Sequence, residues 1–289
     1  MGPAPRRLIV TADDFGSTPG VNEAVEASHR RGILRFASLM VRGAAVRDAV
    51  RVARANPGLG VGVHLDLCEG GCAAAWGLRQ FLRRGRGLEE EIDSQLRLCL
   101  SLGVRPTHLD SHLNVHVHPT VFPMVARAAL RHGIGRIRLT GGELGLRLGF
   151  GLGGLLPSLA MGCVFGCLRS WLKGPRAPAA LSPQGPAVRC NSFPQARELV
   201  VCDAVLGLLR SGMMTEDYLL WIIPRLPAGL TEVYLHPTAD AGASAQAGPT
   251  PTHHSREELR ALTSPRVREC LDRCGVSLVE ARRAGAGPG

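Results

Sequence analysis

Four short apolar, strand-like runs of this chain each end on ionisable residues that could share one site. The runs are LIVTADD, VGVHLD, THLDSH and TEVYLHP. The ionisable residues at their ends are Asp13, Asp14, His64, His112 and His236. One carboxylate and two neutral imidazoles form a common ligand set for a catalytic divalent metal with open positions. The second carboxylate and the third imidazole would then be free to move protons.

Asp13 and Asp14 are adjacent at the end of a strand, so their side chains should diverge. One carboxylate could bind a metal while the other faces the substrate as a base. Without a cation, two neighbouring buried carboxylates would repel each other. The alternative is a helix N-terminus with acidic caps, because Gly16, Ser17 and Pro19 follow directly.

Histidines and aspartates alternate in two of the strand-like runs. His64 and Asp66 would share one strand face, and His108, Asp110 and His112 would share another. The second run opens a segment with four histidines within eleven residues, a density that is uncommon in a chain with ten histidines. A buried metal or proton-transfer site is therefore expected near this segment.

The individual roles in this segment differ. His112 is expected to be a metal ligand, whereas His108 and His118 are more typical of structural histidines. His116 is left open between support of a ligand from behind and contact with the substrate. Asp110 could orient a ligand histidine through its free ring nitrogen.

Two residues further along the chain remain ambiguous on sequence alone. Arg138 follows another apolar run, and it could steady a carboxylate or a reacting oxygen, or lie on the surface. His236 ends TEVYLHP, where Pro237 stops the strand, and it could close a site or be an isolated structural histidine. The chain has no G-x-S-x-G elbow, no Walker loop and no G-x-G-x-x-G between a strand and a helix.

The elements that must position these residues alternate between strand-like and helix-like patterns. Strands are expected at residues 7–12, 36–41, 60–66, 106–110, 136–140, 231–236 and 275–279. Helices are expected at residues 20–31, 44–55, 88–102 and 119–132, with further helical patterns over 199–226. This repetition predicts an α/β fold with about seven mainly parallel strands. Seven strands suit a distorted or incomplete (β/α) barrel better than an open six-stranded sheet.

Residues 143–198 break this rhythm. Residues 148–168 contain no charge and would be long enough to cross a membrane, but they hold many glycines and Pro157. A span between two catalytic strands would also divide the site. We therefore expect an apolar helical excursion that is buried, or an apolar flap at the mouth of the site. One domain is expected over residues 1–280, with a disordered tail at 281–289.

Composition restricts the possible partners and the compartment. The net charge of +10 suits acidic ligands or an anionic membrane face, but only 4% of residues are aromatic and no nucleic-acid-binding motif is present. We therefore expect no nucleic-acid partner. Nine cysteines, with no secretion signal before the first strand, favour reduced thiols in the cytoplasm. The oligomeric state is left open.

The combination of motifs resembles a known family. The segments TADDFG, VGVHLDLCEG, DSHLNVHVHP and LHP, in this order, are similar to the YdjC-like carbohydrate deacetylases. A closer likeness to the branch associated with hopanoid biosynthesis rests on VNEAVEASHRRGIL, ASLMV, VHVHPTV, LLRSGMMTEDYLL and GLTEVYLHPTAD. The similarity covers most of 7–140 and 199–280 and is thin over 143–198. It implies a distorted (β/α) barrel.

The resemblance also implies roles for individual residues. Metal ligands would be Asp14, His64 and His112, the catalytic base would be Asp13, and the proton donor would be His236. Weaker candidates for substrate contact or ligand support are His116, Asp110, Arg138 and Asn114. Two departures from the pattern, Asn114 and Met213, stand where relatives often have histidine. They are expected to change the substrate pocket and not to remove the metal.

The function implied by this resemblance is metal-dependent removal of acetyl from an N-acetylated amino sugar. One divalent ion, Mg²⁺ or Zn²⁺, would activate water and polarise the acetyl carbonyl. The expected substrate is an N-acetylglucosaminyl hopanoid lipid, met by peripheral contact at the inner face of the membrane. The alternatives are a deacetylase of soluble chito-oligosaccharides, another metal-assisted ester or amide hydrolase, and a non-catalytic carbohydrate- or lipid-binding barrel.

Overall fold

The computed structural model describes five long stretches of the chain and some short pieces between them. The stretches are residues 5–68, 73–83, 85–143, 199–240 and 255–281, and the pieces are residues 146, 163, 165–167, 170, 181–182 and 185–186. Most of the expected apolar excursion at 143–198, and all of the expected tail except Ala281, lie outside the described residues. In the described part, no helix is both long enough and apolar enough to cross a membrane.

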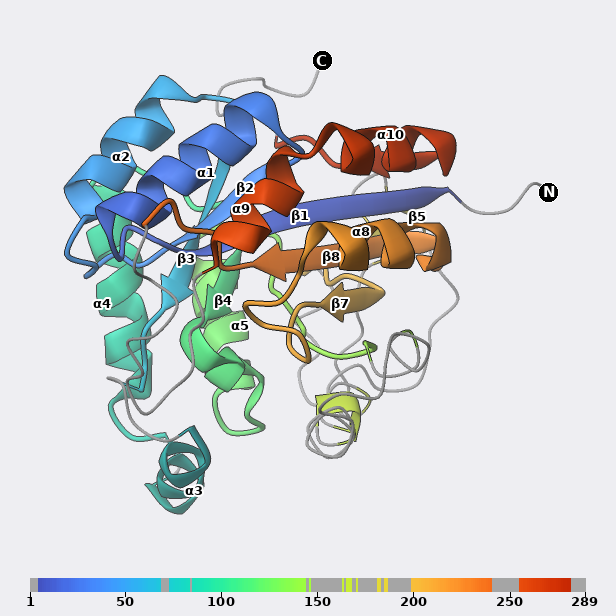
Figure 1. Cartoon of the computed structure of the whole chain (residues 1–289). Helices are drawn as coiled ribbons and strands as arrows, with labels where there is room; N and C mark the ends of the chain where they lie inside the picture. Colours follow the sequence, from blue (N-terminus) through green and yellow to red (C-terminus); the bar gives the residue numbers. More distant parts are fainter. Residues whose placement is uncertain are drawn as a thin grey trace.

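Seven strands form one sheet in which every pair of neighbours is parallel. The order is β4 (Leu109–Ser111), β3 (Gly60–Leu65), β2 (Phe36–Leu39), β1 (Arg6–Phe15), β8 (Gly229–Leu235) and β7 (Ala204–Leu206), while β9 (Val276–Leu278) pairs with the start of β1. β1 and β8 run side by side through the centre of the molecule (Figure 1). The α/β class with mainly parallel strands is therefore confirmed.

The two edges of this sheet are joined by residues 136–141. Ile137 bridges to Leu109 of β4, and Gly141 bridges to Val205 of β7. The Val205 N–H donates to the Gly141 carbonyl over 3.1 Å. The expected strand at 136–140 is thus a set of isolated bridges, and it closes the sheet into a distorted barrel. Gly141 and Gly142, with φ of 133° and 90°, bend the chain away after the last bridge.

Helices surround the strands, as expected from the sequence. Four of the five α-helices described in the first half are α1 (Pro19–Arg31), α2 (Val46–Ala55), α4 (Leu88–Ser101) and α5 (Phe122–Arg131). The boundaries of α1 follow from local chemistry, since the Thr18 side chain accepts the Val21 N–H, Pro19 occupies the first turn and Gly32 ends the helix. α1 packs against α2 and α9, and α4 packs against α5 (Figure 1).

The second half differs more from expectation. Its elements are β7, α8 (Glu216–Ile222), η3 (Ile223–Arg225), β8, α9 (Arg256–Thr263), α10 (Pro265–Arg273) and β9. The first half also contains α3 (Ala73–Arg83) and the 3₁₀ segment η1 (His112–Val117), and a short hairpin joins β5 (Leu181–Ser182) to β6 (Gly185–Pro186).

The helical pattern expected over 199–226 is wrong at β7. Its residues are apolar on both faces because the strand is buried on both sides, so no alternation marks it.

The barrel interior separates into an apolar layer and a charged layer. A small buried cluster contains Ile9, Phe36, Cys202, Val205, Leu230 and Tyr234. Side chains of Thr11 and Glu232 lie near it and bond to each other over 2.9 Å. Beyond them, toward the carboxyl ends of the strands, charged groups dominate. Parallel strands therefore deliver their ionisable residues to one end of the barrel, where barrel enzymes place their chemistry.

Candidate metal and catalytic site

A bulge in β1 brings Asp13 and Asp14 into one site. Ala12 pairs with Ala37 of β2 and Phe15 pairs with Leu39, so β1 carries one extra residue between these pairs. Asp14 adopts a φ of 60°, in the left-handed region that is uncommon for residues other than glycine. Both carboxylates consequently face the same end of the barrel, toward different partners. The alternative of acidic helix caps is wrong, because Thr18 caps α1.

Asp14 lies between two histidines from other strands. Its Oδ1 is 3.3 Å from His64 Nε2 and 3.2 Å from His112 Nδ1. His64 belongs to β3, and His112 follows directly after β4, so residues of two other segments converge on one oxygen of β1. Asp14 and His64 are buried, whereas the His112 side chain is 14% exposed. The three residues are therefore shielded by the barrel at Asp14 and His64, and solvent reaches them at His112.

These three residues fit a divalent cation. Their candidate ligand atoms all lie within 4.8 Å of one another. Two ligands of one ion at about 2.0–2.1 Å stand roughly 3.0–3.4 Å apart, which matches the measured separations. His64 Nδ1 is 2.8 Å from Asp110 Oδ1, and such a carboxylate behind a ligand histidine fixes the ring and its tautomer.

A second group, Asp13, His64 and Asp110, also meets this distance criterion. Arg138 already binds both carboxylates of this group. A cation at that position would compete with the guanidinium. The arrangement therefore favours the set of Asp14, His64 and His112.

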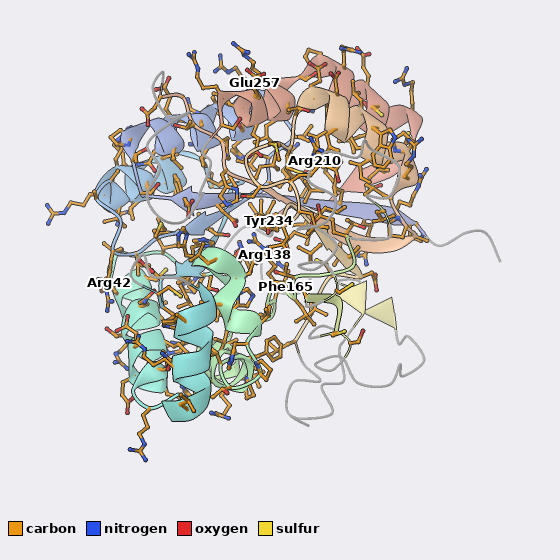
Figure 2. The ribbon with its side chains drawn as sticks, turned by 60° about the horizontal axis from the view of Figure 1, so that its bottom comes forward. Arg42, Arg138, Phe165, Arg210, Tyr234 and Glu257 are labelled. Carbon is orange, nitrogen blue, oxygen red and sulfur yellow. The ribbon has the colours of Figure 1, made fainter. Side chains whose placement is uncertain are left out.

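Arg138 is the central cation of the site, not a surface residue. Its guanidinium donates to both oxygens of Asp13 at 2.6 and 2.7 Å, to Asp110 at 2.8 Å and to Glu232 at 3.1 Å. It also lies over the Tyr234 ring, 4.3 Å from the centroid (Figure 2). The bidentate pair fixes the plane of the Asp13 carboxylate. In Figure 2, Arg42 and Glu257 lie toward the outside of the molecule, away from this centre.

The electrostatics of the buried groups are strongly coupled. Burial alone would lower the pKa of His64, but the carboxylates of Asp110 and Asp13 outweigh it and hold that pKa well above its usual value. Burial would raise the pKa of Asp110, yet Arg138 and His64 bring it far below the usual range. Positive charge is thus favoured at His64 in the absence of a metal.

His236 lies across Asp13 from the metal ligands. Its Nε2 is 4.0 Å from Asp13 Oδ2, and its Nδ1 is 3.3 Å from the Ser211 hydroxyl. Its ring meets Tyr234 edge-on, with centroids 5.8 Å apart. The isolated-histidine alternative is therefore wrong, since His236 joins the same constellation.

The remaining histidines of the dense segment have structural partners. His116 donates from Nε2 to the Arg138 carbonyl over 2.7 Å, and its Nδ1 is 2.8 Å from the Ser111 hydroxyl. Burial lowers the pKa of His116 to about 4. His108 lies between the hydroxyls of Ser38 and Thr107, as the sequence favoured. His116 thus supports the backbone of Arg138 from behind.

Two other residues of the histidine- and aspartate-containing runs, His118 and Asp66, also have partners outside the proposed metal site. His118 accepts the Thr120 N–H through its ring nitrogen, and the Asp66 backbone N–H and carbonyl bond to the Gln95 side-chain amide. Neither residue belongs to the set of Asp14, His64 and His112.

Asn114 occupies a strained turn beside the site. Leu113 and Asn114 have φ of 57° and 54°, and asparagine tolerates this region better than most residues. The Asn114 amide donates to the Tyr234 hydroxyl over 3.2 Å, and its carbonyl accepts from Thr140 over 2.6 Å. Asn114 thus contacts the wall of the site and not the Asp14 ligand set. Met213, the other departure from the family pattern, is 52% exposed.

Sequence reasoning missed several residues of the site. Glu232 and Tyr234 alternate with His236 on one face of β8, and this period of two was a signal that could have found them. Ser211 and Glu258 carried no such signal. Glu258 is fully buried and accepts the backbone N–H groups of His236 and Met214.

Comparisons with known proteins show the family of this chain. The family model described as YdjC-like protein matches residues 7–273. A carbohydrate deacetylase of Geobacillus stearothermophilus is 40% identical over a 141-residue alignment that covers 44% of this chain and 58% of the relative. A chitooligosaccharide deacetylase of Enterobacter sp. (strain 638) is 37% identical over 144 residues, covering 44% and 57% respectively. The chain thus spans a little over half the length of these curated relatives.

A solved structure supports the fold over almost the whole chain. A putative cellobiose-phosphate cleavage protein of Enterococcus faecalis V583 superposes with a TM-score of 0.64 at 20% identity. The superposition covers 96% of this chain and 97% of that one. At this identity the likeness concerns the fold alone.

Proposed function

Because the chain belongs to the YdjC-like protein family, we propose that it is a metal-dependent hydrolase that removes acetyl from N-acetylated amino sugars. The relatives named as carbohydrate and chitooligosaccharide deacetylases support this substrate class. The observation that carries the proposal is the convergence of Asp14 on His64 and His112 beside a separate Asp13–Arg138 pair and His236. Binding of a sugar alone would need neither a separate base nor a separate acid.

Asp14, His64 and His112 are proposed to hold the metal. A divalent cation there would lower the pKa of water and polarise the acetyl carbonyl. Two of the three protein donors are imidazoles, which suit zinc better than magnesium, since magnesium prefers oxygen ligands. Between the two expected ions, the donor set therefore favours Zn²⁺. Asp110 keeps His64 in the tautomer that leaves Nε2 free to bind.

Asp13 is proposed as the general base. Arg138 engages both of its oxygens, so the carboxylate is held in one orientation next to the ligand set. A base needs to be within hydrogen-bond reach of the proton that it removes. The position of Asp13 beside both His64 and His236 supports this role, because a water bound near the ligand set would be close to the carboxylate.

His236 is proposed as the general acid that protonates the departing sugar amine. Its Nδ1 is held near Ser211, and its Nε2 points to the side of Asp13. An amine is a poor leaving group unless it gains a proton as the C–N bond breaks. Asp13 and His236, whose side chains are 4.0 Å apart, would thus serve as base and acid for one amide.

Acetate release from N,N′-diacetylchitobiose tests this function. Protein stripped of metal with a chelator should be inactive, and one equivalent of Zn²⁺ per chain should restore activity. Mg²⁺ at the same concentration is the comparison ion. Full activity in protein shown by elemental analysis to be free of metal would exclude the proposal.

As the specific substrate, we propose an N-acetylglucosaminyl hopanoid, which the protein would meet at the inner face of the membrane. The support is in the sequence: the similarity to the hopanoid-associated branch, the uncharged run at 148–168 and the net charge of +10. Most of the run lies outside the described residues. The competing substrate is a soluble chito-oligosaccharide, which the name of the Enterobacter relative favours.

One assay distinguishes between the two candidate substrates. The lipid and N,N′-diacetylchitobiose are offered at equal concentration, and acetate release gives a specificity constant for each. A higher constant for the soluble sugar would contradict the lipid proposal. In addition, replacing Leu155 and Leu156 with Ser should weaken liposome association more than it lowers thermal stability. The opposite order would place these leucines in a protein core.

A further inference from the structure

Glu258 of α9 ties together two segments that are far from it in the chain. Its side chain is fully buried. Oε2 accepts the backbone N–H of His236 over 2.5 Å, and Oε1 accepts the backbone N–H of Met214 over 2.9 Å. One carboxyl group therefore links the end of β8 to the loop between β7 and α8.

The backbone of His236 depends on this contact because the sheet ends just before it. β1 pairs with β8 only as far as Leu235, and β7 pairs with it only as far as Val233. The described strand pairs thus end before His236, and its N–H bonds to Glu258 instead. A buried N–H needs such an acceptor, because leaving it without one is costly. Its carbonyl accepts the Ser255 N–H over 2.9 Å at the start of α9. Both polar backbone groups of His236 are thus held by α9.

The side chain of His236 depends on the same carboxyl group by a second route. Ser211, which approaches Nδ1, lies in the loop that Glu258 holds at Met214. Glu143 holds the same loop at its other end by accepting the Leu209 N–H over 2.9 Å. Glu258 therefore fixes both the main chain of His236 and the loop that orients its ring.

We propose that Glu258 is a positioning residue for His236: it sets where the proposed proton donor stands relative to Asp13. This inference rests on the proposed function. It predicts that a change at Glu258 acts on proton donation to the leaving group and leaves the Asp14 set intact. The Glu258→Gln variant keeps one acceptor but turns an NH₂ group toward the other N–H donor, which displaces either the strand end or the loop.

Two substrates with different leaving groups make the test specific. The leaving amine of N,N′-diacetylchitobiose needs a proton, whereas the nitrophenolate of 4-nitrophenyl acetate departs without one. Glu258→Gln should lower kcat on the amide by about tenfold to a hundredfold with KM little changed, the scale of a misplaced catalytic group. The ester rate should fall by less than about threefold. Equal losses on both substrates would overturn the proposal.

Glu257→Gln is the matched control. It removes the charge of the neighbouring acidic residue of α9, but Glu257 is exposed and pairs with Arg260 along the helix. Its ratio of amide to ester activity should equal that of the wild type. If Glu258→Gln fails to fold, Glu258→Asp keeps the charge, shortens the side chain by one methylene and should show the same selective loss on the amide.

A readout that is independent of activity separates this proposal from the proposed function. In protein labelled with ¹⁵N-histidine and loaded with Zn²⁺, Glu258→Gln should shift or broaden the His236 signal and leave that of His64 in place. Absence of acetate release by the wild type would reject the deacetylase function alone. An unchanged His236 signal in Glu258→Gln would reject the positioning role.

Discussion

The two sides of the site are built by different means. On the metal side, the side proposed to hold the ion, Asp14, His64 and His112 come from β1, from β3 and from the end of β4, and they meet through their side chains. On the proton-donor side, the side of the proposed acid, His236 is placed by hydrogen bonds to its main chain from α9 and by a loop after β7. Side-chain identity thus decides the first side, and main-chain placement decides the second. Substitutions far from the reacting atoms should therefore act mainly through the proton-donor side.

The two sides also differ in charge. In the described residues around Arg138, the carboxylates are Asp13, Asp14, Asp110 and Glu232, and the guanidinium groups are Arg138 and Arg136. Four negative groups against two positive ones leave a net charge of minus two when the histidines are neutral. A divalent cation balances this charge, while His236 adds nothing to it until it is protonated. Without a metal, the raised pKa of His64 favours a proton there, and this proton offsets only one of the two negative charges.

Removal of a ligand should have the largest effect. Changing Asp14, His64 or His112 to Ala should abolish stoichiometric metal binding and lower turnover by more than about a hundredfold, since residues behind a ligand alone are worth 10- to 100-fold. Elemental analysis and acetate release measure both on the same sample. His118→Ala, outside the set, should keep its metal. Full occupancy in His112→Ala would remove His112 from the metal side.

Loss of the base should be the next largest effect. Asp13→Asn should retain the metal and the fold but lose about a hundredfold in turnover, the usual scale for general base catalysis. His236→Ala should lose a similar factor on the amide and less on 4-nitrophenyl acetate. Stopped assays at saturating substrate give kcat for each. Near-normal turnover in Asp13→Asn would assign the base to another group.

Acidic pH should destabilise the folded protein by favouring protonation of His116, the buried histidine that supports the Arg138 backbone. Burial lowers its pKa to about 4, so the unfolded chain binds more protons than the folded chain between pH 6.5 and 4. Its contribution, about 3 kcal/mol, is present above pH 6.5 and is lost as the pH falls toward 4. Urea unfolding of metal-free protein across this range measures it. His116→Gln, with an amide in place of Nε2, should flatten the dependence, and an unchanged slope would contradict the assignment.

Metal removal should have the smallest effect of the four, on stability. At a metal concentration a hundred times its Kd, binding contributes about 2.7 kcal/mol, and a chelator should lower Tm by about 5–10 °C. Calorimetry with and without chelator measures this difference. In Asp14→Asn the chelator should change nothing. A chelator effect of wild-type size in that variant would place the stabilising ion elsewhere.

The contrast between the two sides explains which residues could be predicted. The strands that carry Asp14 and His64 appear as apolar runs that end on their functional residues, and these motifs are local. The bulge that turns both aspartates into one site could not be predicted, because it depends on the pairing of β1 with β2. β7 was missed because its burial on both faces removes any alternation.

Glu258 shows why the proton-donor side was harder to predict. In SREELRALT, Glu257 and Glu258 look alike as acidic residues of a first helical turn. Glu257 is exposed and pairs with Arg260 along the helix, whereas Glu258 is buried against β8. Only the packing of α9 on the barrel distinguishes them. Residues that act on the main chain of another segment leave no motif.

The closure of the barrel gives Arg138 a second consequence. The bridging segment 136–141 has few ladder hydrogen bonds, yet its Arg138 reaches Asp13 in β1, Asp110 in β4 and Glu232 in β8. Ion pairs of Arg138 therefore help to hold this segment to the barrel, whereas the other strands are held mainly by backbone hydrogen bonds. Local opening of this seam withdraws Arg138 from Asp13. Amide exchange at Val205, whose N–H spans the seam, thus reports how often Asp13, the proposed base, loses its support.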